Sequence, residues 1–220
     1  MILKNNDTWV MIGDSITDAG RADSGEPTPW APQAGWGHGY ANLVASHIEA
    51  IHPDKNIRVI NRGISGNRVL DLKERWDHDV LELKPDILSV FIGVNDVWRQ
   101  CDVPLQVDVH VDEAMYRQTY RELLQKTVSK LKQLILIKPF IIENNKEDLM
   151  RQKIDIYGNI VTELANEFNA ILVDPQIEID KYLKSRHSSA LAWDRIHPNT
   201  TGHLLIARSL MREIGIKIDL

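Results

Sequence analysis

Cysteine is almost absent from this chain. Its 220 residues include one cysteine, Cys101, so the chain can form no internal disulfide and no metal site built from several thiolates. A lone cysteine can serve as a nucleophile, but no histidine-bearing motif pairs with Cys101, and its polar neighbours predict a loop. We therefore assign it no catalytic role.

Long apolar runs and clusters of basic residues are also missing. No apolar stretch approaches the roughly 20 residues of a membrane-spanning helix, so we expect no membrane partner. The formal net charge is -5, without a block of lysine or arginine, so nucleic-acid binding lacks electrostatic support. No pair of histidines has the spacing of a zinc protease, and we expect neither a metal nor another cofactor.

Apolar runs of five to seven residues alternate with longer segments of helical period. The runs are rich in Ile, Val and Leu at consecutive positions, as in parallel strands covered on both faces: 8–13, 57–61, 86–92, 134–139 and 170–174. Helices are predicted over 112–131, with Asp112 as N-cap, and over 200–214, whereas 23–39 and 97–111 are predicted loops. This alternation predicts one domain over 1–220: an α/β fold, a three-layer α/β/α sandwich with a five-stranded parallel sheet.

Three polar motifs follow or precede these elements. Gly-Asp-Ser-Ile-Thr at 13–17 follows the first strand, Gly-Val-Asn-Asp at 93–96 follows the third, and Asp-Arg-Ile-His-Pro at 194–198 precedes the last helix. Ligands of parallel sheets collect at the carboxyl ends of the strands, so we expect the motifs to meet there. A serine, a histidine and an aspartate that meet are the parts needed for acyl transfer through a covalent intermediate.

Each of these side chains has an expected role. Ser15 would be the nucleophile, His197 the base, since an imidazole titrates near neutrality, and Asp194 the group that orients the base. Ser15 could equally serve as a helix N-cap, and Asp194 as the cap of a turn. The other histidines lack comparable sequence context and are expected mostly on the surface, with His203 two turns into the last helix and facing away from the motif.

A tetrahedral intermediate also needs donors for its oxyanion. The main-chain N–H of Ser15, that of Gly63 and the side-chain amide of Asn95 are the candidates, and one such donor contributes about 10²–10³ in rate. A glycine lets its N–H approach the substrate without a side chain in the way. Taken alone, Gly63 also fits an ordinary turn, and Asn95 an Asx turn with Asp96.

These motifs, in this order, closely resemble the SGNH, or GDSL, hydrolase superfamily. The family blocks supply a serine, a glycine, an asparagine and a histidine with an aspartate three positions earlier, and only Ile16 departs from the family pattern, where leucine is usual. The resemblance covers nearly the whole chain. It implies a flavodoxin-like SGNH hydrolase fold and a serine esterase with Ser15, Gly63, Asn95, Asp194 and His197 in the roles above.

Segments 13–18, 63–67, 95–100 and 190–195 are similar to intracellular bacterial acetylxylan esterases of this superfamily. The similarity implies removal of acetyl groups from acetylated xylo-oligosaccharides or related sugars through an acetyl-serine intermediate. It also implies a cytoplasmic protein and a homo-oligomer, since some relatives form large rings. The substrate-binding residues would be Asp14, Trp98 and Trp193, because an indole can stack on a sugar ring; simple core packing is the other reading of both tryptophans.

Other functions make different predictions from the same sequence. A lysophospholipase or thioesterase with broader acyl specificity is the main alternative, although no segment suggests a lipid-facing lid helix. A carbohydrate-binding protein without chemistry would lack a catalytic residue, and none is missing. A nucleotide- or flavin-binding protein would need a glycine-rich phosphate loop, where this chain has the carboxylate of Asp14.

Overall fold

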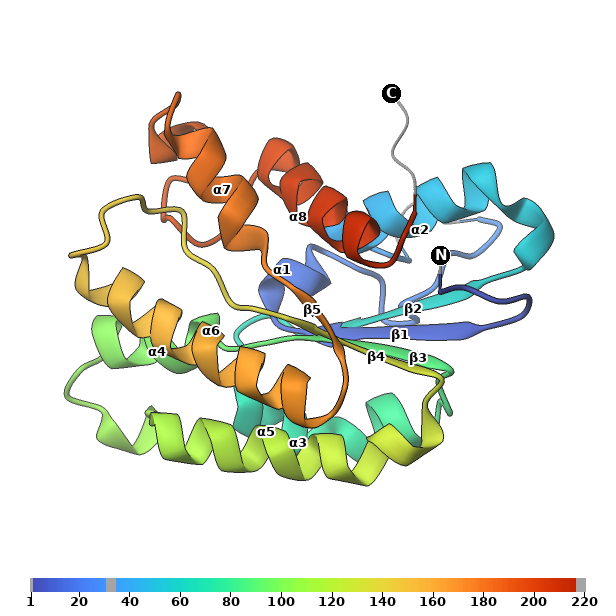
Figure 1. Cartoon of the computed structure of the whole chain (residues 1–220), viewed down its shortest axis with the longest axis horizontal. Coiled ribbons are helices and arrows are strands. Elements are labelled where there is room, and N and C mark those ends of the chain that lie inside the picture. The colour runs from blue at the N-terminus through green and yellow to red at the C-terminus, as the bar shows by residue number, and fades with distance from the viewer. Residues whose placement is uncertain (1, 31–34, 217–220) are drawn as a thin grey trace.

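A five-stranded parallel sheet forms the centre of the molecule. The computed structural model describes residues 2–30 and 35–216. The sheet has the order β2-β1-β3-β4-β5 (Figure 1). Every predicted strand is present, with ends shifted by no more than two residues: β1 (Thr8–Gly13), β2 (Arg58–Gly63), β3 (Ile87–Phe91), β4 (Gln133–Ile137) and β5 (Ile171–Val173).

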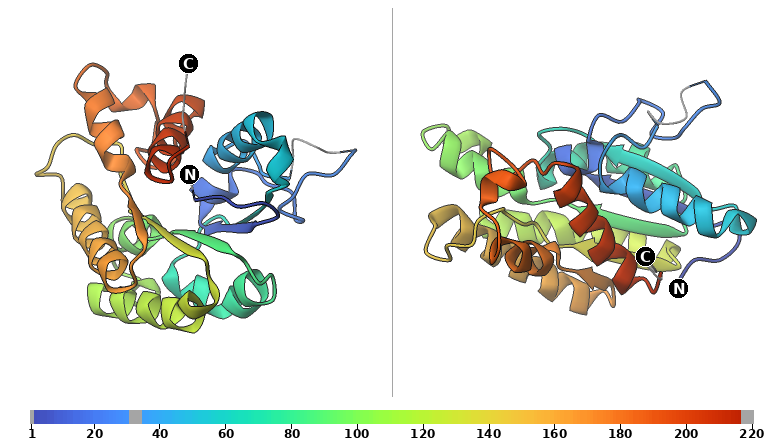
Figure 2. Two further views of the ribbon diagram at one scale, coloured as in Figure 1. Left: turned by 45° about the vertical axis from the view of Figure 1, so that its right-hand side comes forward. Right: turned by 90° about the horizontal axis from the view of Figure 1, so that it is seen from above.

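Helices cover both faces of the sheet, and the predicted three-layer α/β/α sandwich is confirmed (Figures 1 and 2). One layer contains α1 (Ser15–Asp18), α2 (Tyr40–Ile51), α7 (Pro175–Leu183) and α8 (Thr200–Glu213). The other contains α3 (Val69–Trp76), which continues as a π-helical turn (Asp77–Leu81), with α4 (Val94–Asp102), α5 (Glu113–Thr127) and α6 (Leu149–Glu167). Short 3-10 turns lie at Pro53–Lys55, Val107–Val109, Val128–Lys130 and Ser188–Ala190.

The core lies on both sides of the central strands, as their unbroken apolar sequences predict. All five residues of β3 are buried, and so are the last five of β1. Two buried tryptophans keep their polar atoms satisfied: Trp9 Nε1 donates to Ser89 Oγ at 3.0 Å, and Trp76 Nε1 donates to Thr127 Oγ1 at 2.8 Å. The core therefore accommodates large aromatic rings without an unpaired indole N–H.

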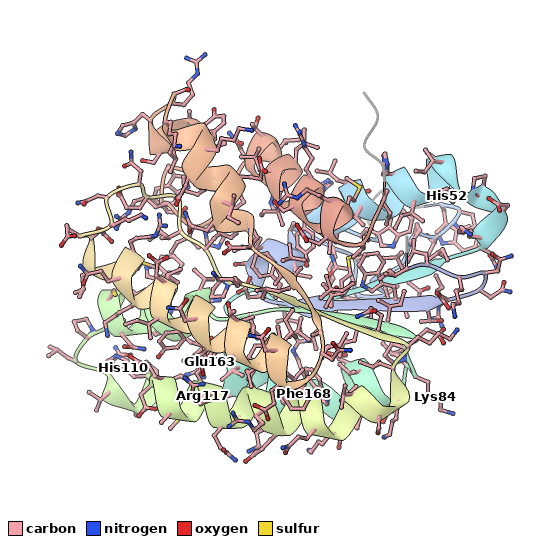
Figure 3. All side chains as sticks on the ribbon, viewed as in Figure 1. His52, Lys84, His110, Arg117, Glu163 and Phe168 are labelled. Carbon is pink, nitrogen blue, oxygen red and sulfur yellow. The ribbon has the colours of Figure 1, made fainter. Side chains whose placement is uncertain are left out.

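The outer faces of α5 and α6 are joined by ion pairs. Arg117 of α5 and Glu163 of α6 face one another in Figure 3 and form a salt bridge. Arg121 pairs with Glu167 one turn further along, at 2.8 Å. Partly exposed pairs of this kind contribute little stability each, so the packing of the two helices depends mainly on their buried faces.

One segment differs from the sequence-based expectation. The predicted loop over 97–111 begins instead as helix α4, and Cys101 lies within that helix. Val94 and Val97 are buried, and Trp98 and Cys101 pack against the core, so the helical spacing was present in the sequence but obscured by polar neighbours. The predicted cap of α5 is confirmed, because Asp112 accepts a hydrogen bond from Met115 N at 2.8 Å.

The predicted loop over 23–39 is described only in part, because its residues 31–34 lie outside the described residues. In the part of the chain that the structure describes, no helix combines the length and the apolar character needed to cross a membrane.

Candidate active site

Ser15 lies on a sharp turn where β1 leads into α1 (Figure 1). A Cβ on Gly13 would lie 2.4 Å from the carbonyl oxygen of Phe91, so only glycine fits at the start of this turn. Asp14 is the N-cap of α1: its carboxylate accepts a hydrogen bond from Ile16 N at 3.0 Å. Since Asp14 performs the capping, the alternative of Ser15 as N-cap is wrong, and the Ser15 side chain is available for another partner.

That partner is His197. Ser15 Oγ lies 2.8 Å from His197 Nε2, and His197 Nδ1 lies 2.5 Å from Asp194 Oδ2. Burial pushes the pKa of Asp194 up, but hydrogen bonds from the His197 ring and from the N–H groups of His197 and Ile196 bring it below its ordinary value. An ionised Asp194 favours the tautomer with a proton on Nδ1, which leaves Nε2 free to accept the Ser15 proton.

The loop that carries His197 is held by its neighbour Arg195. The backbone of Arg195 has a φ of 67°, a conformation that costs free energy in a residue with a side chain. Its guanidinium pairs with Glu143 at 3.1 Å and with Asp148 at 2.9 Å, and its carbonyl accepts from Ile142 N at 2.8 Å. These contacts attach the loop to the segment that follows β4 and so position the imidazole.

The structure changes one of the expected oxyanion donors. Gly63 is buried and its N–H donates to Asn61 Oδ1 at 2.8 Å, so this N–H is already satisfied and the assignment of Gly63 is wrong. Among the described residues, neither Ser15 N–H nor Gly66 N–H forms a hydrogen bond, and Gly66 is exposed. Asn95 Nδ2 donates to the carbonyl of Asn67 at 3.0 Å, which places its amide beside the Gly66 segment with one N–H left over.

The three expected substrate-binding residues have different surroundings. Asp14 is buried, and burial raises the pKa of its carboxyl to about 7; it caps a helix and presents no surface to a sugar, so this expectation is wrong. Trp98 packs edge-on against the His197 ring, with centroids 5.8 Å apart. Trp193 is 89% exposed, which excludes core packing within this chain.

A partly buried arginine beneath the site was not anticipated. Arg75 of α3 donates to the carbonyls of Gly13 at 2.9 Å and Arg62 at 2.8 Å, and to Asn67 Oδ1 at 2.7 Å. It also pairs with Asp79 at 2.6 Å. One guanidinium thus joins the ends of β1 and β2 to the segment next to Gly66. An arginine on an amphipathic helix normally faces solvent, so the sequence carried no signal for this role.

Asp96 was likewise missed as a site residue. It is fully buried, and its Oδ1 accepts a hydrogen bond from Val69 N at 3.0 Å. Its Oδ2 has no hydrogen-bond partner among the described residues, and burial raises the pKa of this carboxyl to about 7. Asp96 and its neighbour Asn95 therefore hold residues 67 and 69, on either side of Arg68, and position the turn that presents Gly66.

Among the remaining histidines, His203 is not where we expected it. It lies in the first turn of α8 because the helix begins after the Asn199 cap, and it is buried. Burial lowers the pKa of His203 to about 4, and its neutral ring accepts a hydrogen bond from Tyr40 N at 3.2 Å. His52, at the end of α2, lies toward the amino ends of the strands, away from their carboxyl ends (Figure 3). Within residues 2–30 and 35–216, no three His, Cys, Asp or Glu side chains are grouped to hold a metal.

Comparison with known proteins agrees with this geometry. Residues 11–205 match the model of the GDSL-like lipase/acylhydrolase family. The chain is 44% identical to the acetylxylan esterase of Geobacillus stearothermophilus over 217 residues, which cover 99% of this chain and 98% of the relative. A crystal structure of that esterase superposes with a TM-score of 0.95 and covers 99% of this chain and 98% of its own.

Four further solved structures are similar. An α/β hydrolase enzyme from the metagenome of Lake Arreo, Spain, is 43% identical, covers 98% of both chains and has a TM-score of 0.94. Three structures of the Geobacillus esterase are described as catalytic mutants, at a serine, an aspartate and a histidine, with the last two three positions apart. The same three residue types meet in this chain.

Proposed function

This chain belongs to the GDSL-like lipase/acylhydrolase family and is a carboxylic ester hydrolase, and we propose that it removes acetyl groups from acetylated xylo-oligosaccharides. The observation that carries the chemistry is the continuous hydrogen-bonded chain from Ser15 through His197 to Asp194, with links of 2.8 and 2.5 Å. The substrate is supported by the full-length similarity to an acetylxylan esterase.

The first half of the proposed reaction transfers the acetyl group to the enzyme. Ser15 Oγ attacks the acetyl carbonyl carbon while His197 Nε2 takes the hydroxyl proton, and Asp194 stabilises the resulting imidazolium. The carbonyl oxygen gains a negative charge and accepts hydrogen bonds from Ser15 N–H, Gly66 N–H and the amide of Asn95. His197 then gives its proton to the departing sugar oxygen, which leaves an acetyl-serine.

The second half repeats these steps with water. His197 takes a proton from a water molecule that attacks the acetyl-serine, and the same donors hold the oxyanion. Collapse of this intermediate returns the proton to Ser15 Oγ and releases acetate. No cofactor takes part in this scheme.

Acetate release tests both the chemistry and the substrate class. Wild type and Ser15→Ala are compared on acetylated xylo-oligosaccharides, with Ser46→Ala as a matched control because Ser46 lies exposed on α2. We expect release by wild type and Ser46→Ala only. Release by clean Ser15→Ala would remove Ser15 as the nucleophile, and hydrolysis of octanoyl but not acetyl nitrophenyl esters would favour a lysophospholipase or thioesterase.

We also infer that the protein is a cytoplasmic homo-oligomer. Trp30 and Trp193 are 86% and 89% exposed, and large exposed apolar side chains often mark contact surfaces between proteins. The resemblance to intracellular esterases supports the location. Light scattering coupled to size-exclusion chromatography measures the molar mass in solution, and a value near 25.2 kDa would contradict an oligomer.

A further inference from the structure

A cavity of about 330 Å³ lies between α4, the first turn of α6 and the loop that carries His197. Trp98, which packs against the His197 ring, and Arg195, two residues before His197, both line it. The cavity therefore adjoins the proposed base. Its volume is at the small end of the range of ligand sites, about 300–1,000 Å³, and suits a small ligand better than a long chain.

The chemistry of ester cleavage determines which part of a substrate would reach this cavity. The carbonyl oxygen must lie among the oxyanion donors, whereas the leaving oxygen must lie within hydrogen-bonding distance of His197 Nε2. Gly66 follows β2, and Asn95, at the start of α4, directs its amide toward the segment next to Gly66. The cavity lies beyond β3, where the later residues of α4 meet the segment after β4. The cavity is thus on the side of the leaving group.

The charges around the cavity favour a neutral, polar ligand. Arg195 is paired with Glu143 and Asp148, and Arg99, whose guanidinium stacks on Trp98 at 4.5 Å, is paired with Asp102 at 2.6 Å. Both of these cations are paired, and the second carboxylate beside Arg195 leaves one excess negative charge, which disfavours a phosphate or a carboxylate. The paired groups still present oxygens and N–H groups that can bond to hydroxyls.

Apolar side chains complete the lining. Leu149, which is 65% exposed, and Met150 lie at the same cavity. Carbon-bound faces of a sugar ring pack on such side chains, while its hydroxyls bond to the polar groups. We propose that this cavity is a subsite for the sugar part of the leaving group, next to the unit that carries the acetyl ester. The identity of that sugar rests on the proposed function; the position of the subsite rests on His197.

The single cysteine allows a direct test, because Cys101 lines the cavity and the sequence contains no other thiol. Methyl methanethiosulfonate converts a thiolate into a methyl disulfide and releases methanesulfinate. The labelling rate of Ser15→Ala protein is measured with and without saturating, unacetylated xylotriose. We expect at least threefold slower labelling with the sugar, and an unchanged rate would overturn the proposal.

Two controls make this labelling specific. The double variant Cys101→Ser/Ser46→Cys carries its thiol on exposed α2 and should label equally fast with and without the sugar. Maltotriose at the same concentration controls for viscosity and for any sugar effect on the reagent. Because binding is read without turnover, protection without acetate release by wild type would leave the subsite standing and refute the proposed substrate. Acetate release without protection of Cys101 would support the proposed substrate and refute the subsite.

Filling the cavity gives an independent kinetic test. Leu149→Trp should lower kcat/KM for acetylated xylotriose at least tenfold more than kcat/KM for nitrophenyl acetate, whose leaving group is not a sugar. Ile51→Trp, an exposed apolar position at the end of α2, serves as the matched control. Equal losses on both substrates would overturn the proposal, since they would indicate damage to the catalytic groups themselves.

Discussion

The Asp194 carboxylate holds the His197 ring with one oxygen and the backbone beside that ring with the other. Its Oδ2 lies 2.5 Å from Nδ1 of His197, and its Oδ1 accepts the N–H groups of Ile196 and His197, both at 2.9 Å. The spacing of three residues makes both contacts possible within one turn. The aspartate therefore has an electrostatic role and a structural role, and two substitutions can separate them.

Asp194→Asn should remove the electrostatic role and keep much of the turn. An amide N–H facing Nδ1 would force the wrong imidazole tautomer, so we expect kcat for nitrophenyl acetate to fall by about 10²–10⁴. Asp194→Ala should lose as much activity and also lower the melting temperature further, because two backbone N–H groups lose their acceptor. Asp54→Asn, at an exposed position, is the control. Near-normal kcat in Asp194→Asn would contradict the orienting role.

The asparagine of the proposed oxyanion hole gives a second prediction. Asn95→Ala should lower kcat by about 10²–10³ with a small change in KM, because the donor acts mainly in the transition state. A loss of about 1 kcal/mol in the free energy of unfolding should accompany it, since Asn95 also donates to Asn67. Equal kcat with a raised KM would indicate ground-state binding instead.

Substitution of the two glycines distinguishes donor from structural residue. At Gly66 a Cβ meets nothing within 4 Å, but the φ of +83° is unfavourable for alanine, so Gly66→Ala should fold with a loss of about 1–2 kcal/mol. Its kcat should fall at least tenfold as the N–H shifts. At Gly63 a Cβ would lie 2.1 Å from Asp18 N, so Gly63→Ala should fail to fold stably. Wild-type kcat in Gly66→Ala would argue against this donor.

The fold could be predicted from the sequence because its signals are local. Strand β1 was predicted with its observed ends, and each other strand to within two residues, since a buried parallel strand is a continuous apolar run. Helix α4 was missed because most residues of 95–102 are polar, and two of them, Asn95 and Asp96, are buried. The composition of this segment is typical of a loop, and only the helical spacing of its apolar residues indicates a helix.

The site could be predicted only where the chemistry prescribes the residue type. Ser15, His197 and Asp194 were identified since few residue types can perform their roles, and the structure brings them together. The choice between Gly63 and Gly66 depended on which N–H a neighbour occupies, and this is a property of the folded backbone. The contacts of Arg75 join segments far apart in the sequence and could not be inferred from spacing.

Arg75 should be far more important for stability than exposed charges on the same helix. Arg75→Met would leave Asp79 without its closest cation and would remove one donor from each of the carbonyls of Gly13 and Arg62. We expect a loss of about 3–5 kcal/mol in the free energy of unfolding and reduced kcat, because Asn67 also loses a contact. Lys73→Met, which breaks the exposed pair with Glu122, should cost less than about 1 kcal/mol. Urea unfolding measures both variants, and a similar loss of free energy of unfolding in Arg75→Met and Lys73→Met would contradict this prediction.

The buried carboxyl of Asp96 should make stability depend on pH in an unusual direction. Its pKa is raised by burial from 3.8 to about 7, so between these values the folded protein binds more protons than the unfolded chain. The Asp96 carboxyl therefore contributes its full stabilisation below pH 3.8, and this stabilisation is lost as the pH rises through about 7. The loss amounts to a few kcal/mol, since one pKa unit corresponds to about 1.4 kcal/mol.

Asp96→Asn tests this directly, because an amide keeps the acceptor for Val69 N and has no proton to lose. Relative to wild type, the variant should gain stability between pH 5 and pH 8 in urea unfolding. The nearby Asp14 remains in both proteins, so its own titration largely cancels in the difference, while its charge adds to the raised pKa of Asp96. Asp54→Asn should show no such trend. A stability difference between Asp96→Asn and wild type that stays constant with pH would mean that the Asp96 carboxyl has the same protonation in both states. The buried Oδ2 would then need a cation or a proton donor that holds it ionised.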